Sequence, residues 1–187
     1  MSKRAVTWLL AGLAIVGPAA GSAIAQTAMS SETVMVGGAP MYPVKNIIQN
    51  AVNSKDHTTL VAAVKAAGLV ETLEGKGPFT VFAPTNEAFA KLPPGTVDTL
   101  LKPENKATLV KILTYHVVAG SYTAADLMKM VKAGGGKAML KTVAGEPLTI
   151  SQSGTKLFVS GDESGVAEVT IPNVRQSNGV IHVVNSV

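Results

Sequence analysis

The chain has 187 residues, of which 47% are hydrophobic and only 15% charged, a balance that predicts one folded domain and excludes a disordered tail. The formal net charge of +4 comes with scattered lysines, and aromatic residues make up only 4% of the sequence, which excludes a nucleic-acid-binding stripe. Because the chain has no cysteine, disulfides, thiol nucleophiles and cysteine-ligated metals are excluded as well.

The first 25 residues have the pattern of a secretory signal peptide. Lys3 and Arg4 precede a mainly apolar run over residues 5–16, and residues 23–25 form a cleavage site of the small-x-small type. The run is shorter than the roughly 20 residues that a helix needs to span a bilayer, which favours a cleaved signal peptide. The alternative is an uncleaved membrane anchor. We therefore expect Sec-type export, cleavage after Ala25, a secreted or periplasmic location, and no stable membrane span after the signal is removed.

Residues 26–41 are small and mostly polar, which predicts a short flexible lead-in to a single domain over residues 42–187. Two segments then carry apolar residues at helical spacing, over residues 47–52 and 60–67. Gly68 stands where a glycine would end the second of these helices.

The middle of the chain predicts one strand and three helices. Residues 79–83 form a β-type run between prolines. A short helix begins at Asn86, and a longer helix begins near Pro103, a residue suited to a first helical turn. The longer helix carries an apolar stripe that includes His116, and a further helix covers residues 123–132.

The last third of the chain predicts β-strands. Its strand-like runs are residues 148–150, 157–159, 166–171 and 180–184. We expect a hairpin turn at Ser153-Gly154 and a type I′ turn at Asn178-Gly179. Helices first and strands last, without regular alternation, indicate the α+β class.

Three segments, in the order in which they occur, resemble the signature blocks of the fasciclin (FAS1) family. They are Thr-Val-Phe-Ala-Pro-Thr-Asn-Glu-Ala-Phe at residues 80–89, Tyr-His-Val-Val at 115–118 and Asn-Gly-Val-Ile-His-Val-Val at 178–184. The resemblance implies an α+β domain in which a β-sandwich or wedge packs against several α-helices. We expect the signature side chains to lock helices onto strands, leaving the outer surface to meet partners; they are Phe82, Pro84, Thr85, Asn86, Phe89, His116, Asn178, Gly179 and His182.

Four residues are candidates for an interaction site. Tyr115 and His116 lie in a block that resembles an adhesion motif of animal members, and the alternative is a neutral, hydrogen-bonded core histidine. Asn173 and Val174 stand where animal matrix members carry a short acidic motif implicated in integrin binding. Because an amide cannot supply the anionic ligand that a metal-dependent receptor needs, we expect no integrin binding by that route.

The sequence contains no pattern that predicts catalysis, a metal site or a cofactor. His57, His116 and His182 are its only histidines, and they do not have the spacings of zinc sites. Ser164 lies in Gly-Asp-Glu-Ser-Gly, which is not the nucleophile elbow of hydrolases. Glycines 134–136 lack the following lysine of a phosphate-binding loop, and they are better explained as a helix end.

The resemblance implies an exported, non-enzymatic interaction module for cell adhesion or for attachment to a cell surface or matrix. Its expected partner is a cell-surface or matrix protein or a polysaccharide. The alternative is a periplasmic carrier or sensor that binds a small ligand in an apolar groove between the helices and the sheet.

Overall fold

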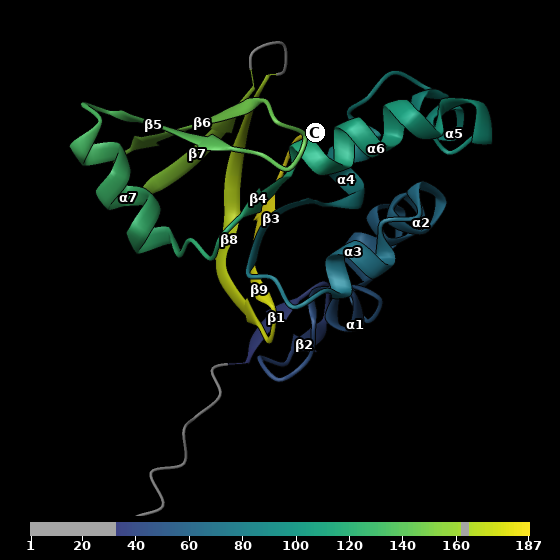
Figure 1. Ribbon diagram of the computed structural model, residues 1–187, viewed down its shortest axis with the longest axis horizontal. Coiled ribbons are helices and arrows are strands. Elements are labelled where there is room, and N and C mark those ends of the chain that lie inside the picture. The colour runs from purple at the N-terminus through teal and green to yellow at the C-terminus, as the bar shows by residue number, and fades with distance from the viewer. Residues whose placement is uncertain (1–32, 162–164) are drawn as a thin grey trace, which may run out of the picture.

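The computed structural model describes residues 33–161 and 165–187 (Figure 1). Within these residues the chain forms nine β-strands, seven α-helices and two short 3-10 helices. The predicted signal peptide, residues 1–25, lies outside the described residues.

The elements follow one another in the order that the sequence indicates, with helices concentrated in the first two thirds of the chain. The helical elements are α1 (Ile47–Ala51), η1 (Lys55–His57), α2 (Thr58–Ala67), α3 (Val70–Glu74), α4 (Asn86–Ala90), α5 (Thr96–Leu100), η2 (Pro103–Asn105), α6 (Lys106–Tyr115) and α7 (Ala124–Ala133). The strands are β1 (Val34–Val36), β2 (Ala39–Met41), β3 (Phe79–Pro84), β4 (Val117–Ala119), β5 (Lys137–Lys141), β6 (Pro147–Ser153), β7 (Lys156–Ser160), β8 (Val166–Gln176) and β9 (Gly179–Val184).

Seven strands make one curled sheet in the order β4-β3-β9-β8-β7-β6-β5. Strands β3 and β9 pair in parallel, and the other neighbours are antiparallel. A bridge between Val118 and Thr142 joins the two outer ends of the sheet, so the sheet closes into a wedge. Helices α1 to α6 lie to one side of this wedge and α7 lies on the other (Figure 1). The predicted α+β class, with a β-wedge packed against several helices, is confirmed.

Strands β3 and β9 lie between two hydrophobic cores, so both of their faces are buried, as is usual for parallel pairs. Val81 and Ile181 face the first core, which the β1–β2 hairpin and helices α1, α2, α3, α4 and α6 complete. Phe82 and Val184 face the second core, which is enclosed by α7 and the inner faces of β5 to β8.

The long strand β8 contributes to both cores because it bends. Its register against β9 shifts between Val169 and Ile171 and again between Ile171 and Val174. Val169 belongs to the second core and Val174 to the first. Between them Asn173 has a φ of 59°, a left-handed conformation that asparagine tolerates better than most residues.

Residues 34–41 fall in the predicted flexible lead-in, but they form a β-hairpin, so this part of the prediction is wrong. Strands β1 and β2 pair in the register Val34 with Met41 and Val36 with Ala39. Gly37 and Gly38 at the turn have φ values of 58° and 75°, which a type I′ turn requires. The hairpin folds onto the domain because Val36 and Met41 are buried in the first core.

The predicted type I′ turn at Asn178-Gly179 is also wrong. The two turn residues are Ser177 and Asn178, and Gly179 already pairs with Gln176 as the first residue of β9. Neither Asn178 nor Gly179 has a positive φ, which both central residues of a type I′ turn require. Glycine is needed at 179 because a Cβ there would overlap the backbone carbonyl of Phe79 on the neighbouring strand.

Candidate functional site

The first signature block forms the corner between β3 and α4. Thr85 caps α4 because its hydroxyl accepts a hydrogen bond from the backbone N–H of Ala88 at 3.2 Å. Asn86 ties this corner to the start of α2: its Oδ1 accepts from the N–H of Thr59 at 3.0 Å, and its Nδ2 donates to the carbonyl of Lys55 at 2.8 Å. Thr85 therefore caps α4, and Asn86 connects the start of α4 to η1 and α2.

His182 is fully buried and has partners at both ring nitrogens. Its ring stacks on Phe82, with 5.6 Å between the ring centroids. Nε2 lies 2.8 Å from the carbonyl of Tyr122, and the backbone N–H of Asn173 donates to Nδ1 at 3.3 Å. The ring is therefore neutral and donates through Nε2, and burial lowers the pKa of His182. The remaining apolar signature residues of the first block are buried too: Phe82, Pro84 and Phe89.

Asn178 connects the end of the sheet to two helices. Its Oδ1 accepts a hydrogen bond from the N–H of Ile47 at the start of α1, at 3.1 Å. Its Nδ2 donates to the carbonyl of Leu73 at 2.6 Å and to that of Gly75 at 2.9 Å, at the end of α3. The Asn178 side chain therefore satisfies three backbone groups of α1 and the end of α3.

Tyr115 and His116 form the end of α6, where both are half-buried. The Tyr115 hydroxyl donates to the carbonyl of Pro147 at 3.1 Å, which joins the helix to β6. The Nδ1 atom of His116 lies 2.8 Å from the carbonyl of Ile112, one turn back in the same helix. Burial lowers the pKa of His116, and the hydrogen bond to Ile112 only partly opposes this. The Tyr115 hydroxyl and His116 Nδ1 therefore both contact backbone carbonyls of the domain.

Asn173 and Val174 lie in the bend of β8. Val174 is buried in the first core. Asn173 is exposed, but its Oδ1 accepts a hydrogen bond at 2.7 Å from the N–H of Ala124, the first residue of α7. Asn173 therefore contacts α7, whereas Val174 packs in the same core as Leu113 of α6.

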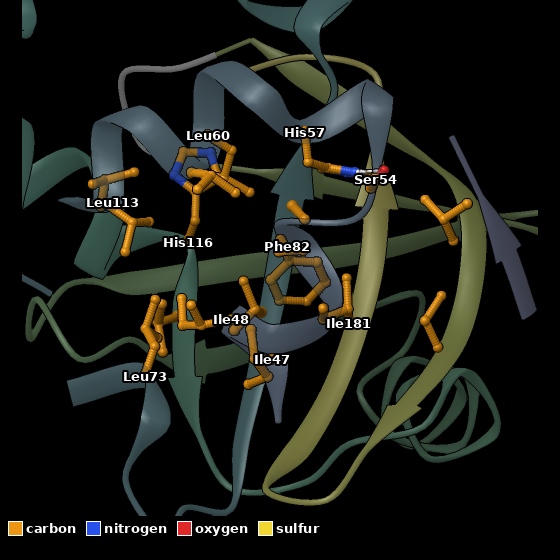
Figure 2. Close-up of a pocket in the computed structure, with 18 of the residues that line it drawn as sticks. Ile47, Ile48, Ser54, His57, Leu60, Leu73, Phe82, Leu113, His116 and Ile181 are labelled. Carbon is orange, nitrogen blue, oxygen red and sulfur yellow. Dashed lines mark hydrogen bonds between the residues drawn. The ribbon is translucent and has the colours of Figure 1, made fainter. Parts of the chain in front are cut away.

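A mostly apolar cavity of about 40 Å³ lies between the helices and the sheet in the first core (Figure 2). Its walls come from the β1–β2 hairpin, α1, α2, α3, α6, β3 and β9, and its side chains include Met41, Ile47, Ile48, Leu60, Val64, Leu73, Val81, Leu113 and Ile181. The polar side chains that reach it are Ser54, His57 and His116.

His57 is buried at the wall of this cavity, with 3% of its surface exposed. Its Nδ1 lies 2.9 Å from the hydroxyl of Ser54, a contact drawn in Figure 2. Its Nε2 has no partner in hydrogen-bond geometry. Burial lowers the pKa of His57, and the Ala83 carbonyl and the Asp56 carboxylate only partly offset this.

The cavity and the unpaired nitrogen are both defects in an otherwise well-packed core. A void of about 40 Å³ costs roughly 1 kcal/mol, at about 24 cal/mol per Å³. A buried donor or acceptor without a partner costs about 1–3 kcal/mol. The apolar void between the helices and the sheet is a candidate ligand site.

A second candidate is the outer face of strands β5 to β8, which we call the outer sheet face. One row across it is Met139, Thr149, Ser160 and Val166, and the next is Lys137, Ser151, Phe158 and Glu168. Met139 is 68% exposed and Val166 is 64% exposed. Helix α7 covers the opposite face, where Leu127 and Val131 pack in the second core.

Charges surround this outer sheet face. Lys137 and Lys141 point outward from β5 and are exposed. Lys156 pairs with Glu168 at 2.7 Å. Among the residues that the structure describes, this face combines an apolar centre, hydroxyl groups, the exposed side chains of Lys137 and Lys141, and the Lys156–Glu168 ion pair.

Strand β5 and the outer sheet face were missed by the sequence reasoning. The alternation of Lys137-Ala138-Met139-Leu140-Lys141 is the signal that could have revealed the strand. The sequence identifies His57 only as a possible metal ligand, because its position at the wall of the cavity depends on the tertiary fold.

Over residues 33–161 and 165–187, no three histidine or acidic side chains are grouped as ligands for a metal ion. In the same part of the chain, no helix has both the length and the apolar character needed to cross a bilayer.

Comparison with known proteins gives a consistent result. The model of the fasciclin domain matches residues 55–187. Protein sll1483 from Synechocystis sp. is 46% identical over 165 residues, which cover 88% of this chain and 84% of that protein. Transforming growth factor-beta-induced protein ig-h3 from Sus scrofa is 38% identical over 128 residues, which cover 68% of this chain and 17% of that protein.

A solved structure has the same fold. The FAS1 domain pair from the insect cell adhesion molecule fasciclin I matches with a TM-score of 0.69 at 19% sequence identity, over 78% of this chain and 51% of that chain. The domain match begins at Lys55, so the β1–β2 hairpin, α1 and Ser54, which wall one side of the cavity, precede the matched residues.

Proposed function

This chain belongs to the fasciclin domain family, and on that basis we propose that it is an exported, non-enzymatic interaction module. It attaches to a protein or polysaccharide of a cell surface or matrix. The family supports an adhesion-related role, since the fold matches that of a domain pair from an insect cell adhesion molecule. We infer the surface that contacts this partner from the exposed side chains of the chain itself.

The observation that carries the proposal is the contrast between the signature residues and the outer sheet face. His182, Asn178 and Asn86 each bond to backbone groups of other elements. The Tyr115 hydroxyl and the Nδ1 atom of His116 also lie at hydrogen-bond distance from backbone carbonyls of the domain. These residues stabilise the fold, so we place partner contact elsewhere.

The outer sheet face has the composition of a contact surface. Met139, Phe158 and Val166 provide apolar area on a rigid sheet, and such area on a soluble surface marks interaction sites. Lys137 and Lys141 at its edge favour an acidic partner, since charge complementarity speeds association and selects partners. The partner that fits is therefore an acidic surface protein or polysaccharide.

The test compares substitutions in this face with one elsewhere. Met139→Glu and Val166→Glu place a negative charge on the outer sheet face, and Val44→Glu places one at an exposed apolar residue, 81% exposed, between β2 and α1. Binding of each purified variant to cell-envelope and matrix preparations is measured by biolayer interferometry, and folding is checked by thermal unfolding.

We expect the two face variants to lose binding by about tenfold or more, the equivalent of about 1.4 kcal/mol. The Val44→Glu control should stay within about twofold of the native protein. Equal binding by all four proteins, or a loss confined to Val44→Glu, would place the contact surface elsewhere.

A further inference from the structure

We propose that Asn178 is a modification site of the unfolded chain: its side chain deamidates there, the fold protects it, and the modified chain does not regain the native fold. This property does not depend on attachment by the outer sheet face, and it goes beyond the proposed function. Three features of the molecule support it: a reactive dipeptide, an amide held by distant parts of the chain, and neighbours to which a carboxylate cannot donate.

Asn178 is followed by Gly179, and this is the one Asn-Gly pair in the sequence. In an unfolded chain the backbone nitrogen of Gly179 can attack Cγ of Asn178, because glycine has no Cβ to obstruct the approach and its backbone rotates freely. The new N–Cγ bond closes a succinimide ring, the Cγ–Nδ2 bond breaks, and ammonia leaves with the proton of the backbone nitrogen. Water then opens the ring at either of its carbonyl carbons, which gives aspartate or isoaspartate.

In the folded protein the Asn178 amide is held away from this reaction. The residue is 7% exposed. Its Oδ1 accepts a hydrogen bond from the N–H of Ile47, and its Nδ2 donates to the carbonyls of Leu73 and Gly75. All three bonds must break before the side chain can turn toward the backbone nitrogen of the next residue.

The peptide group between Asn178 and Gly179 is fixed as well. The Asn178 carbonyl accepts a hydrogen bond from the N–H of Phe79 at 3.0 Å. Gly179 pairs with Gln176 of β8 and with Phe79 of β3, and a Cβ on Gly179 would overlap the Phe79 backbone. The rotation that brings the Gly179 nitrogen onto Cγ would disrupt these contacts, so the reaction requires the strands to separate.

The bonds of the Asn178 side chain join parts of the chain that are far apart in sequence. Ile47 is 131 positions away and Leu73 is 105 positions away. Such bonds form only when α1, the end of α3 and the β8–β9 hairpin have come together. The rate of deamidation therefore follows the fraction of unfolded molecules. A chain exported before it folds stays open to the reaction until these elements meet.

Neither product of the reaction fits the native contacts. An aspartate at this position still accepts from the Ile47 N–H, but its second oxygen replaces Nδ2 and faces the carbonyl oxygens of Leu73 and Gly75, which only accept hydrogen bonds. Burying a carboxylate against two acceptors is strongly unfavourable. Isoaspartate adds a methylene group to the main chain, which disturbs the pairing of Gln176 with Gly179 across the turn.

The experiment incubates the full chain at mildly alkaline pH, in native buffer and in urea above the unfolding midpoint. Peptide mapping by mass spectrometry follows each asparagine. We expect Asn178 to deamidate before the other asparagines in urea, and at least about a hundredfold more slowly in native buffer. Gly179→Ala is measured in urea, where no fold is needed, and should slow the reaction severalfold because its Cβ obstructs the attacking nitrogen.

Asn178→Asp tests the consequence of deamidation directly. Asn53→Asp is the matched control, because Asn53 is exposed and donates to the Gln49 carbonyl at the protein surface. After dilution from urea, Asn53→Asp should recover the native circular dichroism signal and urea midpoint, whereas Asn178→Asp should stay unfolded or unfold at a lower urea concentration.

Three results would overturn the proposal. They are equal deamidation rates of Asn178 in native buffer and in urea, earlier deamidation of another asparagine in urea, and an unchanged urea midpoint in Asn178→Asp. Attachment by the outer sheet face is measured separately, so either idea can fail alone.

Discussion

Replacement of His182 is the sharpest test of the idea that the signature residues stabilise the fold. His182→Ala removes a fully buried ring that stacks on Phe82. It also leaves the Tyr122 carbonyl and the Asn173 N–H without their partner. His182→Phe is the matched variant, because it keeps the ring and the stacking but strands the same two backbone groups.

The magnitudes follow from these contacts. Removing a buried aromatic ring costs about 3–5 kcal/mol in transfer and cavity terms, to which the stacking adds about 0.5–1.5 kcal/mol. Each stranded backbone group costs about 1–3 kcal/mol, less for the longer contact to Asn173. We expect His182→Phe to lose about 2–4 kcal/mol of unfolding free energy, and His182→Ala to lose at least 4 kcal/mol.

The assay is urea unfolding at pH 7, monitored by circular dichroism and by the loss of native-state NMR peaks. The difference between the two variants reports the ring's packing, and the loss in His182→Phe reports the two hydrogen bonds. If His182→Phe unfolds within about 0.5 kcal/mol of the native protein, the hydrogen-bond reasoning is refuted and His182 acts by shape alone.

Three other changes test the remaining contacts. Burial lowers the pKa of His57 and His182, so the unfolded chain binds more protons than the folded protein below about pH 6.5. The free energy of unfolding should therefore fall with acidification, by at most about 1.4 kcal/mol per pH unit per histidine. Urea midpoints at pH 7 and pH 5 check this, and unchanged midpoints would contradict it. Asn178→Ala strands three backbone groups and should lose about 2–4 kcal/mol, which thermal unfolding measures; a loss below 1 kcal/mol would show that water replaces the amide. Asn173→Val forces a β-branched residue to a φ of 59° and removes the bond to Ala124, so it should lose about 2–3 kcal/mol, while Asn173→Asp keeps an acceptor at the start of α7 and should lose less than about 1 kcal/mol; equal losses in urea unfolding would refute this explanation.

Much of the fold could be predicted because local patterns agree with the tertiary structure. Periodic apolar residues located α2 and α6, and Gly68 ends α2 with a φ of 73°, as its position predicts. The predicted hairpin between β6 and β7 also forms, but its two turn residues are Gly154 and Thr155, because Ser153 still pairs with Lys156. In each case a single element's own residues contain the signal.

The errors arose where distant contacts override local preference. Asn178 and Gly179 favour a type I′ turn in isolation, but the Asn178 side chain bonds to α1 and α3, and Gly179 is fixed by the close approach of Phe79. The β1–β2 hairpin was missed because three-residue strands give little periodic signal, and its stability depends on Val36 and Met41 entering the first core.

The candidate sites were harder to predict than the fold. The cavity is lined from several elements that are far apart in sequence, and no local motif indicates where they meet. The outer sheet face depends on the register of four strands, which brings Met139 and Val166 into one row. The signature residues, by contrast, were identifiable by resemblance, and that they stabilise the fold is our proposal from contacts such as those of Asn178 and His182.

Hydroxyl-radical footprinting of the protein, alone and bound to envelope or matrix material, tests the central claim most directly. Met139 on the outer sheet face and Met35 on the hairpin are similarly exposed, at 68% and 58%, so they form an internal pair of reporters. We predict that binding slows oxidation of Met139 severalfold and leaves Met35 unchanged. Protection of Met35 or of the Tyr115–His116 segment, with Met139 oxidised at its original rate, would contradict the account.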